Sequence, residues 1–287
     1  MIHPRTLGSA DLVRCVELSS EAGWNQNEGD WRFLLEHGHG YGIELTGKGL
    51  VATTGAWPMG EAFTWINLVL VTSSCRGLGL ARTLLDRCLA DTKLRGQIAL
   101  LDATDQGFPV YTKRGFSGTT RLVRLKWSRD DLTSSLTESR DGGDTVEMMV
   151  ESDLSAVQAM DRAVLGADRK ALLASLWQRC PQAAWVLKGS RGEVRGFLMG
   201  RGGRTARQLG PLMVESARDA RALVSRALRQ LKGPVYIDVP EQHLVWMGEL
   251  SKLGFQPERR FRRMGQEGVM LETDWDHYFA LAGPDFA

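Results

Sequence analysis

The chain has 287 residues, of which 43% are apolar and 24% are charged, a composition typical of a folded globular protein. Lysine and arginine outnumber aspartate and glutamate by 36 to 34, and residues 1–128 hold 14 basic and 12 acidic side chains. Neither half has the basic excess that binding to a phosphate backbone or an anionic membrane requires, so we expect neither nucleic acid nor a membrane as partner.

The sequence also carries information about cellular location and about the state of the cysteines. No apolar run reaches the roughly 18 residues of a membrane span, and the N-terminus lacks the sections of a signal peptide, which predicts a cytoplasmic protein. The cysteines are isolated from one another and from histidine, which predicts reduced thiols and no metal site. They are Cys15, Cys75, Cys88 and Cys180.

The sequence repeats itself at an offset close to 140 residues. At a constant spacing of 139, a set of positions recurs in order, Ala81, Leu84, Gly115 and Phe116 matching Ala220, Leu223, Gly254 and Phe255. Residues 128–144 are polar and almost without large apolar side chains, as in a solvated linker. The sequence therefore predicts a domain over residues 1–128, a linker over 129–144 and a second copy over 145–287.

Each copy predicts the same order of elements. In the first, a helix begins near Asp11, a second covers 31–36, two strands lie within 40–57, a strand covers 64–71, an amphipathic helix starts at 80, and a strand over 98–101 precedes a short helix. In the second, the elements lie near Asp153 and over 169–177, 183–200, 207–214, 220–231 and 235–239. A strand meander followed by a helical crossover predicts an α/β fold with a mixed sheet and helices on both faces.

The junction between the strand over 64–71 and the next helix is rich in glycine. Gly77 and Gly79 allow a ligand to approach the backbone, and the first N–H groups of the helix are unpaired donors at the positive end of its dipole. A pyrophosphate fits such a junction, although a tight turn without a ligand explains the same residues. The third glycine of a dinucleotide fingerprint and the lysine of a P-loop are both missing.

Together with the later Tyr111 and Gly115-Phe116, the segment Arg76-x-x-Gly79-x-Ala81 resembles the acyl-CoA signature of the Gcn5-related N-acetyltransferase (GNAT) superfamily. Residues 101–116 are also similar to a bacterial subgroup with a second acetyltransferase-like domain at the C-terminus. The resemblance implies tandem GNAT-like domains and acetyl-CoA as cosubstrate, with no metal.

The resemblance also implies how the cofactor binds. The strand ending at residue 71 would separate from the strand over 98–101 to admit the pantetheine arm, and the Val71 N–H would polarise the acyl carbonyl, a role worth about 3 kcal/mol in comparable sites. The implied contacts are Arg76, Gly77, Leu78, Gly79, Leu80 and Ala81 around the pyrophosphate, Val69 and Val71 along the arm, and Thr104 as a further hydrogen-bonding group.

Two catalytic residues are expected. Tyr111 matches the family's proton donor to the leaving thiolate, a transfer uphill by about 2 kcal/mol at ordinary pKa values, although packing alone would also explain this tyrosine. Asp102 is the candidate base and Glu61 an alternative, while water relays take this role in many relatives and a turn or cap role suits both acids.

Acceptor specificity in this family usually comes from the loop between the first two helices, here residues 23–28. We therefore expect Trp24 and Trp57 to wall an apolar or aromatic acceptor and Asn25 to contact it, with core packing as the alternative for the tryptophans. A cluster of arginines suits a solvated face, with one of them as an alternative ligand for a substrate carboxylate. These are Arg259, Arg260, Arg262 and Arg263.

The second copy has lost the signature residues. Aligned at 139, Arg76 becomes Glu215, Gly79 becomes Arg218 and Tyr111 becomes Leu250. We therefore expect one cofactor site, in the first half, with the second half walling the acceptor cleft. Asp238, in the place of Asp102, is the expected ammonium contact there, with a strand-end cap as the alternative.

The sequence thus predicts an N-acetyltransferase that moves an acetyl group from acetyl-CoA to a primary amine of a small molecule or peptide by direct attack, as a monomer or homodimer. A non-catalytic acyl-CoA sensor is the alternative, which the retained Tyr111 disfavours. An aminoacyl or peptidyl transferase that uses tRNA shares the tandem fold, but it should lack the glycine loop and would need a basic surface.

Overall fold

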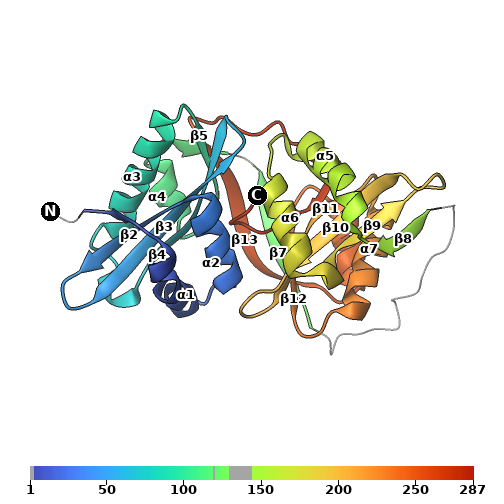
Figure 1. The fold of residues 1–287 in the computed structure, drawn as a ribbon, viewed down its shortest axis with the longest axis horizontal. Helices are drawn as coiled ribbons and strands as arrows, with labels where there is room; N and C mark the ends of the chain where they lie inside the picture. Colours follow the sequence, from blue (N-terminus) through green and yellow to red (C-terminus); the bar gives the residue numbers. More distant parts are fainter. Residues whose placement is uncertain (1–2, 119, 129–143) are drawn as a thin grey trace. The chain divides into compact units, whose positions relative to one another are not determined.

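The computed structural model describes residues 3–118, 120–128 and 144–287, so the predicted linker lies outside the described residues except for Asp144. The chain forms two compact units (Figure 1). Unit 1 comprises Met1–Gly118, Gly203–Thr205 and Arg263–Met270, and unit 2 comprises Thr119–Gly202, Ala206–Arg262 and Leu271–Ala287. Each unit therefore contains residues from both copies of the repeat.

Unit 1 is a mixed sheet with helices on both faces. Its elements are β1 (Arg5–Thr6), α1 (Leu12–Glu21), α2 (Glu28–His37), β2 (His39–Leu45), β3 (Gly49–Met59), β4 (Phe63–Val71), α3 (Leu80–Leu94), β5 (Ile98–Ala103), α4 (Phe108–Thr112) and β6 (Phe116–Ser117). The strand order is β1-β2-β3-β4-β5, antiparallel except for the parallel pair β4–β5. Helices α1 and α2 cover one face of β2–β4 and α3 covers the other (Figure 1).

The core between α3 and the sheet forms because the apolar side chains of this helix recur at helical spacing. Leu80, Leu84 and Cys88 are fully or almost fully buried against Ile66 and Leu101 of the sheet. Val69, Val71, Phe108 and Tyr111 are partly buried and pack on the same cluster.

Unit 2 repeats this plan. Its elements are β7 (Arg121–Trp127), β8 (Thr145–Met148), α5 (Leu154–Leu165), α6 (Lys170–Arg179), β9 (Trp185–Lys188), β10 (Val194–Arg201), β11 (Arg207–Met213), α7 (Ala217–Gln230), β12 (Val235–Pro240), α8 (Leu244–Lys252), most of β13 (Gln256–Gln266) and β14 (Tyr278–Ala280). The strand order is β13-β7-β12-β11-β10-β9-β8, and the pair β11–β12 is parallel. Single 3₁₀ turns occur at Ser9–Asp11, Ser73–Cys75, Glu151–Asp153 and Pro181–Ala183.

The predicted fold class is confirmed, and the predicted elements are found with boundaries shifted by a few residues. The second helix begins earlier than predicted because the Asn27 side chain accepts a hydrogen bond from the Asp30 N–H at 3.1 Å and caps it. None of the described helices is both long and apolar enough to cross a bilayer. All four cysteines belong to the described part of the chain and are buried free thiols.

Two strands that we did not predict lie, wholly or in part, in the unit formed mainly by the other copy of the repeat. Strand β7 is encoded in the first half of the sequence but belongs to unit 2, where it pairs with β12. Strand β13 is encoded in the second half, but its end, from Arg263 to Gln266, belongs to unit 1, next to β5 and β6 in the strand order. The exchange places side chains from the second half within the unit that carries the glycine loop.

Candidate active site

Strands β4 and β5 of unit 1 pair only near their beginnings. The register joins Phe63 to Ile98, Thr64 to Ala99 and Trp65 to Leu100, and it ends there. Beyond this point β4 bulges against β3, and Leu68 adopts a left-handed conformation with φ of 50°. A bulge bends and twists the strand that carries it. Residues 66–71 and 101–103 thus form the two arms of an opening that we call the β4–β5 fork.

At Asp102 the fork exposes backbone rather than a side chain. The carboxylate of Asp102 is 0% exposed, whereas the residue as a whole is half-buried, so its accessible atoms belong to the backbone. Val69 and Val71 on the facing strand are also half-buried. Exposed strand backbone at the point where two strands separate can accept an extended chain that carries amide groups.

The predicted phosphate loop follows β4 after the 3₁₀ turn over Ser73–Cys75. Gly77 and Gly79 have φ of 81° and 77°, values that side chains other than glycine rarely adopt. Gly79 precedes α3, and no side chain caps the first N–H groups of this fifteen-residue helix. Arg76 and Leu78 are exposed, and the Arg76 Nε donates to the Val71 carbonyl at 3.3 Å. Leu80 is buried in the core and Ala81 is half-buried, so these two can offer the loop only their backbone.

Glu21, at the end of α1, holds the segment between β4 and this loop, and sequence reasoning missed it. Its carboxylate accepts from the Thr72 hydroxyl at 2.7 and 2.8 Å and from the Ser73 N–H at 2.6 Å. These hydrogen bonds, led by that of the Ser73 backbone, lower the pKa of Glu21. No sequence pattern marks the contact, because its partners are more than fifty residues away.

Tyr111 lies on α4, the short helix that follows β5. Its ring is half-buried and packs edge-on against Phe116, with ring centroids 6.0 Å apart. The Thr104 hydroxyl accepts a hydrogen bond from the Gly107 N–H at 3.2 Å, which fixes the turn into α4. A Cβ on Gly107 would lie 2.8 Å from the Tyr111 ring, so this glycine lets the ring lie close to the turn.

Neither candidate base, Asp102 or Glu61, lies in a position that suits proton abstraction from an amine in the fork. Both oxygens of Asp102 accept from Arg263, at 2.9 Å each, and a carboxylate engaged by a guanidinium is a weak proton acceptor. Glu61 is exposed in the turn between β3 and β4, at the closed end of the β4–β5 pair. Among the four arginines interpreted as a solvated face, Arg263 is therefore a buried partner of Asp102.

The predicted acceptor loop, residues 23–28, is held by the second half of the sequence. The Asn25 side chain is 4% exposed, and its Oδ1 accepts from the N–H and the hydroxyl of Thr205. Trp24 is half-buried, and its carbonyl accepts from Arg204. Trp57 lies in the core, edge-on to Phe33 at 5.5 Å, which is the alternative that we gave for it.

The equivalent fork of unit 2 is filled by the chain itself. Strands β11 and β12 pair through Leu209 and Ile237, and β14 then joins β11 through Leu212–Ala280 and Met213–Tyr278. On the other arm, the Leu281 N–H donates to the Asp238 carbonyl at 2.8 Å. A Cβ on Gly210 would lie only 1.8 Å from the Leu281 carbonyl oxygen, so the fork admits this chain because that residue is glycine.

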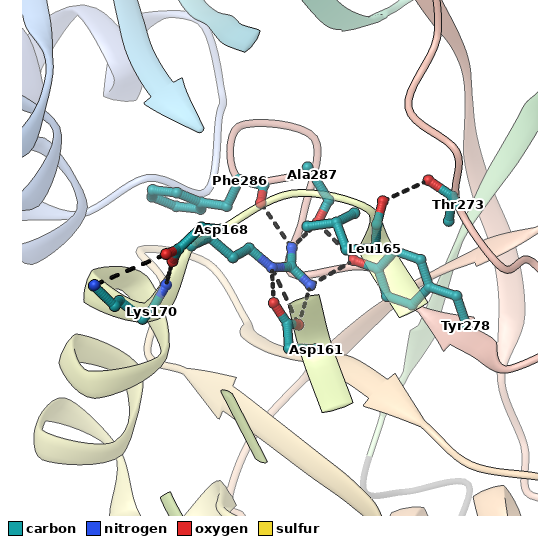
Figure 2. A network of polar contacts seen from close by, with 9 residues as sticks. Asp161, Leu165, Asp168, Lys170, Thr273, Tyr278, Phe286 and Ala287 are labelled. Atoms are coloured by element: carbon teal, nitrogen blue, oxygen red, sulfur yellow. Dashed lines mark hydrogen bonds and ion pairs between the residues drawn. The ribbon is translucent and has the colours of Figure 1, made fainter. Parts of the chain in front are cut away.

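Figure 2 shows the polar network that anchors β14. The buried guanidinium of Arg169 donates to both oxygens of Asp161, to the Tyr278 hydroxyl and to the Phe286 and Ala287 carbonyls. Tyr278 in turn donates to the Ala287 carbonyl at 2.7 Å. The nearby Asp161 carboxylate raises the pKa of Arg169 against the opposing effect of burial, so the guanidinium stays charged.

The other features of unit 2 also differ from a cofactor site. Ser216 caps α7 by accepting from the Asp219 N–H at 3.2 Å, and Glu215 pairs with Arg195. A cavity of about 360 Å³ remains beside β14, lined by residues 215–217, 242–246 and Phe279. Asp238 is 1% exposed and is engaged by Arg124 and Gln208, which leaves its carboxylate no access to an ammonium group from solvent.

Comparison with known sequences assigns both copies of the repeat. The family model described as acetyltransferase (GNAT) family matches residues 11–116, and the one described as acetyltransferase (GNAT) domain matches residues 157–280. An uncharacterized N-acetyltransferase of Bacillus subtilis, YitH, is 27% identical over 249 residues, which cover 85% of this chain and 84% of that protein.

Solved structures show the same fold. An acetyltransferase candidate from Pyrococcus horikoshii superimposes with a TM-score of 0.79 at 18% identity, over 100% of this chain and 96% of the other. A tandem GNAT protein from the clavulanic acid biosynthesis pathway superimposes with a TM-score of 0.70 at 13% identity, over 94% of this chain and 99% of the other. These structures therefore match both units of the chain.

Proposed function

Because the chain belongs to the Gcn5-related N-acetyltransferase family in both of its halves, we propose that it transfers the acetyl group of acetyl-CoA to a primary amine at the β4–β5 fork. The observation that carries this proposal is the contrast between two equivalent forks. In unit 2 the fork holds an extended peptide through backbone pairing, and the Asp238 carbonyl is one of its acceptors. In unit 1 the backbone of the equivalent Asp102 is exposed.

The pantetheine arm of acetyl-CoA suits such an opening. It is an extended chain with two amide groups, so it can pair with strand backbone as β14 does in unit 2. The glycine loop begins a few residues after Val71, so a cofactor that enters the fork along β4 has its pyrophosphate close to Gly79 and the N-terminus of α3. In unit 2, Ser216 caps the equivalent helix, which supports a single cofactor site.

The proposed reaction is direct acyl transfer. A neutral amine attacks the thioester carbon, a C–N bond forms and the C–S bond breaks, so that the amine must lose one proton and the thiolate must gain one. Tyr111 is the proposed proton donor because it lies on the helix after β5 and packs on the same cluster as Val69 and Val71. The amine gives its proton to water, since Arg263 engages Asp102 and Glu61 lies at the closed end of the fork.

The acceptor that we propose is a primary amine of a small molecule or a peptide. The experiment that tests the function incubates the full chain with acetyl-CoA and a panel of polyamines, amino acids, amine-bearing antibiotics and peptides with free N-termini, and it measures the CoA thiol released. Release that depends on one class of amine supports the proposal. Tight binding of acetyl-CoA without release for any class would instead identify a non-catalytic sensor.

Three of the protein's four thiols will contribute little background to this assay. Burial raises the pKa of Cys15 and of Cys88 to about 12, and burial also raises the pKa of Cys180. A thiol reagent reacts with the thiolate, so these side chains stay unreactive near neutral pH while the protein is folded.

A further inference from the structure

A side chain encoded in the second half of the sequence reaches the origin of the β4–β5 fork. Trp65 and Leu100 are the last residues paired before the strands separate, and Asp102 lies two residues further along β5, on the same face as Leu100. Arg263 donates from Nε and Nη2 to the two oxygens of Asp102, at 2.9 Å each. Its guanidinium also lies 4.6 Å from the centre of the Trp65 ring.

Arg263 therefore connects the two strands where they part. The side chains of Arg263 and Asp102 are 1% exposed or less and Trp65 is fully buried, so water does not compete for these contacts. A planar guanidinium that is bidentate to a carboxylate and stacked on an indole has one favourable orientation, which lysine cannot reproduce. A Cβ on Gly265 would lie 1.7 Å from the Val269 carbonyl oxygen and 3.0 Å from the Leu100 side chain, so β13 lies close to β5 at this glycine.

Unit 2 contains a related ion pair. Arg124 precedes Arg263 by 139 residues, and it donates to both oxygens of Asp238 at 2.8 and 2.9 Å. Its guanidinium lies 4.8 Å from the centre of the Tyr236 ring, which is on β12 like Asp238, whereas Trp65 in unit 1 is on the strand that faces Asp102. The fork beside this pair holds β14, so a bidentate arginine–aspartate pair occurs in the same molecule beside a fork that contains an extended chain.

We propose that Arg263 is a positioning residue for the acyl end of acetyl-CoA. It fixes the point at which β4 and β5 separate, and hence the width of the fork where the thioester lies. Arg263 acts through Trp65 and Asp102 and does not touch the reacting atoms. This inference rests on the proposed function, because it requires acetyl-CoA to occupy the β4–β5 fork.

The test separates the two ends of the cofactor. Calorimetry with the full chain measures the affinity for acetyl-CoA and for adenosine 3′-phosphate 5′-diphosphate, the nucleotide part that the glycine loop would hold. Arg263→Lys keeps the buried positive charge but loses the bidentate geometry. We expect the dissociation constant for acetyl-CoA to rise about tenfold and that for the nucleotide to change less than twofold.

A second variant covers the case in which Arg263→Lys does not fold. Asp102→Leu combined with Arg263→Met removes both charges together and leaves neither unpaired in the interior. We expect this double variant to lose at least as much acetyl-CoA affinity as Arg263→Lys, again with the nucleotide affinity retained. If Arg263→Lys is unfolded, the acetyl-CoA and nucleotide affinities of the double variant test the role of Arg263 instead.

Arg124→Lys is the matched control, since it disturbs the equivalent pair in unit 2. It should lower the melting temperature as Arg263→Lys does, but leave the acetyl-CoA affinity within twofold of the wild type. Acetyl-CoA affinity that is equal in Arg263→Lys and the wild type, or lowered equally by the control, would overturn the role of Arg263. A wild-type chain that does not bind acetyl-CoA would instead reject the proposed function, so the two failures are distinguishable.

Discussion

Asn25 and Thr205 are 180 residues apart in the sequence, yet the Asn25 Oδ1 accepts hydrogen bonds from both the backbone N–H and the hydroxyl of Thr205, at 2.9 and 2.8 Å. Arg204 adds two contacts to the same loop, from its backbone N–H to the Asn25 carbonyl at 2.8 Å and from its Nε to the Trp24 carbonyl at 2.9 Å. The conformation of the predicted acceptor loop thus depends on a short segment of the second copy.

Thr205→Val tests this dependence because it removes the hydroxyl and keeps the backbone donor. One lost hydrogen bond is worth about 1 kcal/mol, so we expect the KM for the amine to rise about threefold to tenfold while the KM for acetyl-CoA stays constant. Thr273→Val, which removes a hydroxyl bonded to the Leu165 carbonyl in unit 2, is the control. Equal amine KM values in both variants would show that the loop does not set acceptor binding.

Gly79→Val should weaken acetyl-CoA binding at least tenfold, or about 1.4 kcal/mol. At φ of 77° a β-branched residue is strained, so the loop would shift and its N–H groups would turn away from the pyrophosphate. Gly96→Val, at φ of 67° and likewise with no heavy atom near its Cβ, introduces the same strain away from the loop. Equal affinities of the two variants by calorimetry would show that the loop is only a turn.

Tyr111→Phe should lower kcat by roughly 10²–10⁴ and leave the affinity for CoA almost unchanged, because a general acid acts on the transition state. The substitution keeps the ring that packs against Phe116. Steady-state kinetics with the amine found by the panel, together with calorimetry, measure both quantities. Unaltered turnover would assign Tyr111 a packing role.

The contacts of Glu21 predict a dependence of stability on pH. The hydrogen bonds from Ser73 and Thr72 lower its pKa in the folded state below the ordinary value of 4.5. The stabilisation is therefore present above about pH 4.5 and is lost as the pH falls through the lower, folded-state pKa. Because the side chain is exposed, we expect less than about 1 kcal/mol.

Thermal melts of Glu21→Gln and of the wild type should therefore differ at pH 7 and converge on acidification. Glu17→Gln, on the same helix but paired with the half-buried Arg14, serves as the control. A difference between Glu21→Gln and the wild type that is the same at pH 7 and pH 3 would exclude the carboxylate as its source.

Deletion of residues 145–287 should abolish the function of unit 1. The truncation removes Arg263 and Thr205, and a buried ion pair that loses one partner costs about 3–5 kcal/mol, a large part of a domain's stability. We expect aggregation, or a soluble fragment without acceptor-dependent turnover, by gel filtration and thiol release. A monomeric fragment that acetylates the same amine at the full rate would contradict this expectation.

The local parts of the site could be predicted from the sequence because neighbouring residues build them. The glycine loop, the helix that follows it and the position of Tyr111 after β5 all depend on residues within one strand-to-helix connection. The bulge at Leu68 and the closure of the second fork by β14 left no comparable local signal, since each depends on which strand lies alongside.

The arginines of β13 show why the other parts of the site could not be predicted from the sequence. Arg259, Arg260 and Arg263 look alike in the sequence, and the first two are exposed as a solvated face requires. Arg263 is buried because Asp102, 161 residues earlier, neutralises it. The repeat itself held a usable signal, because Arg124 and Arg263 are separated by the same 139 residues that relate the other matched positions.

The exchange of β7 and the end of β13 has a consequence for the synthesis of the protein. Unit 1 needs residues as late as Met270, so it cannot close while the first half of the sequence leaves the ribosome, whereas Arg124 of unit 2 is already made when its partner Asp238 follows 114 residues later. Contacts of such long sequence separation slow folding. In a nascent first half β13 does not yet cover β5 and Asp102 has no arginine, so an open strand edge stays exposed until the second half is complete.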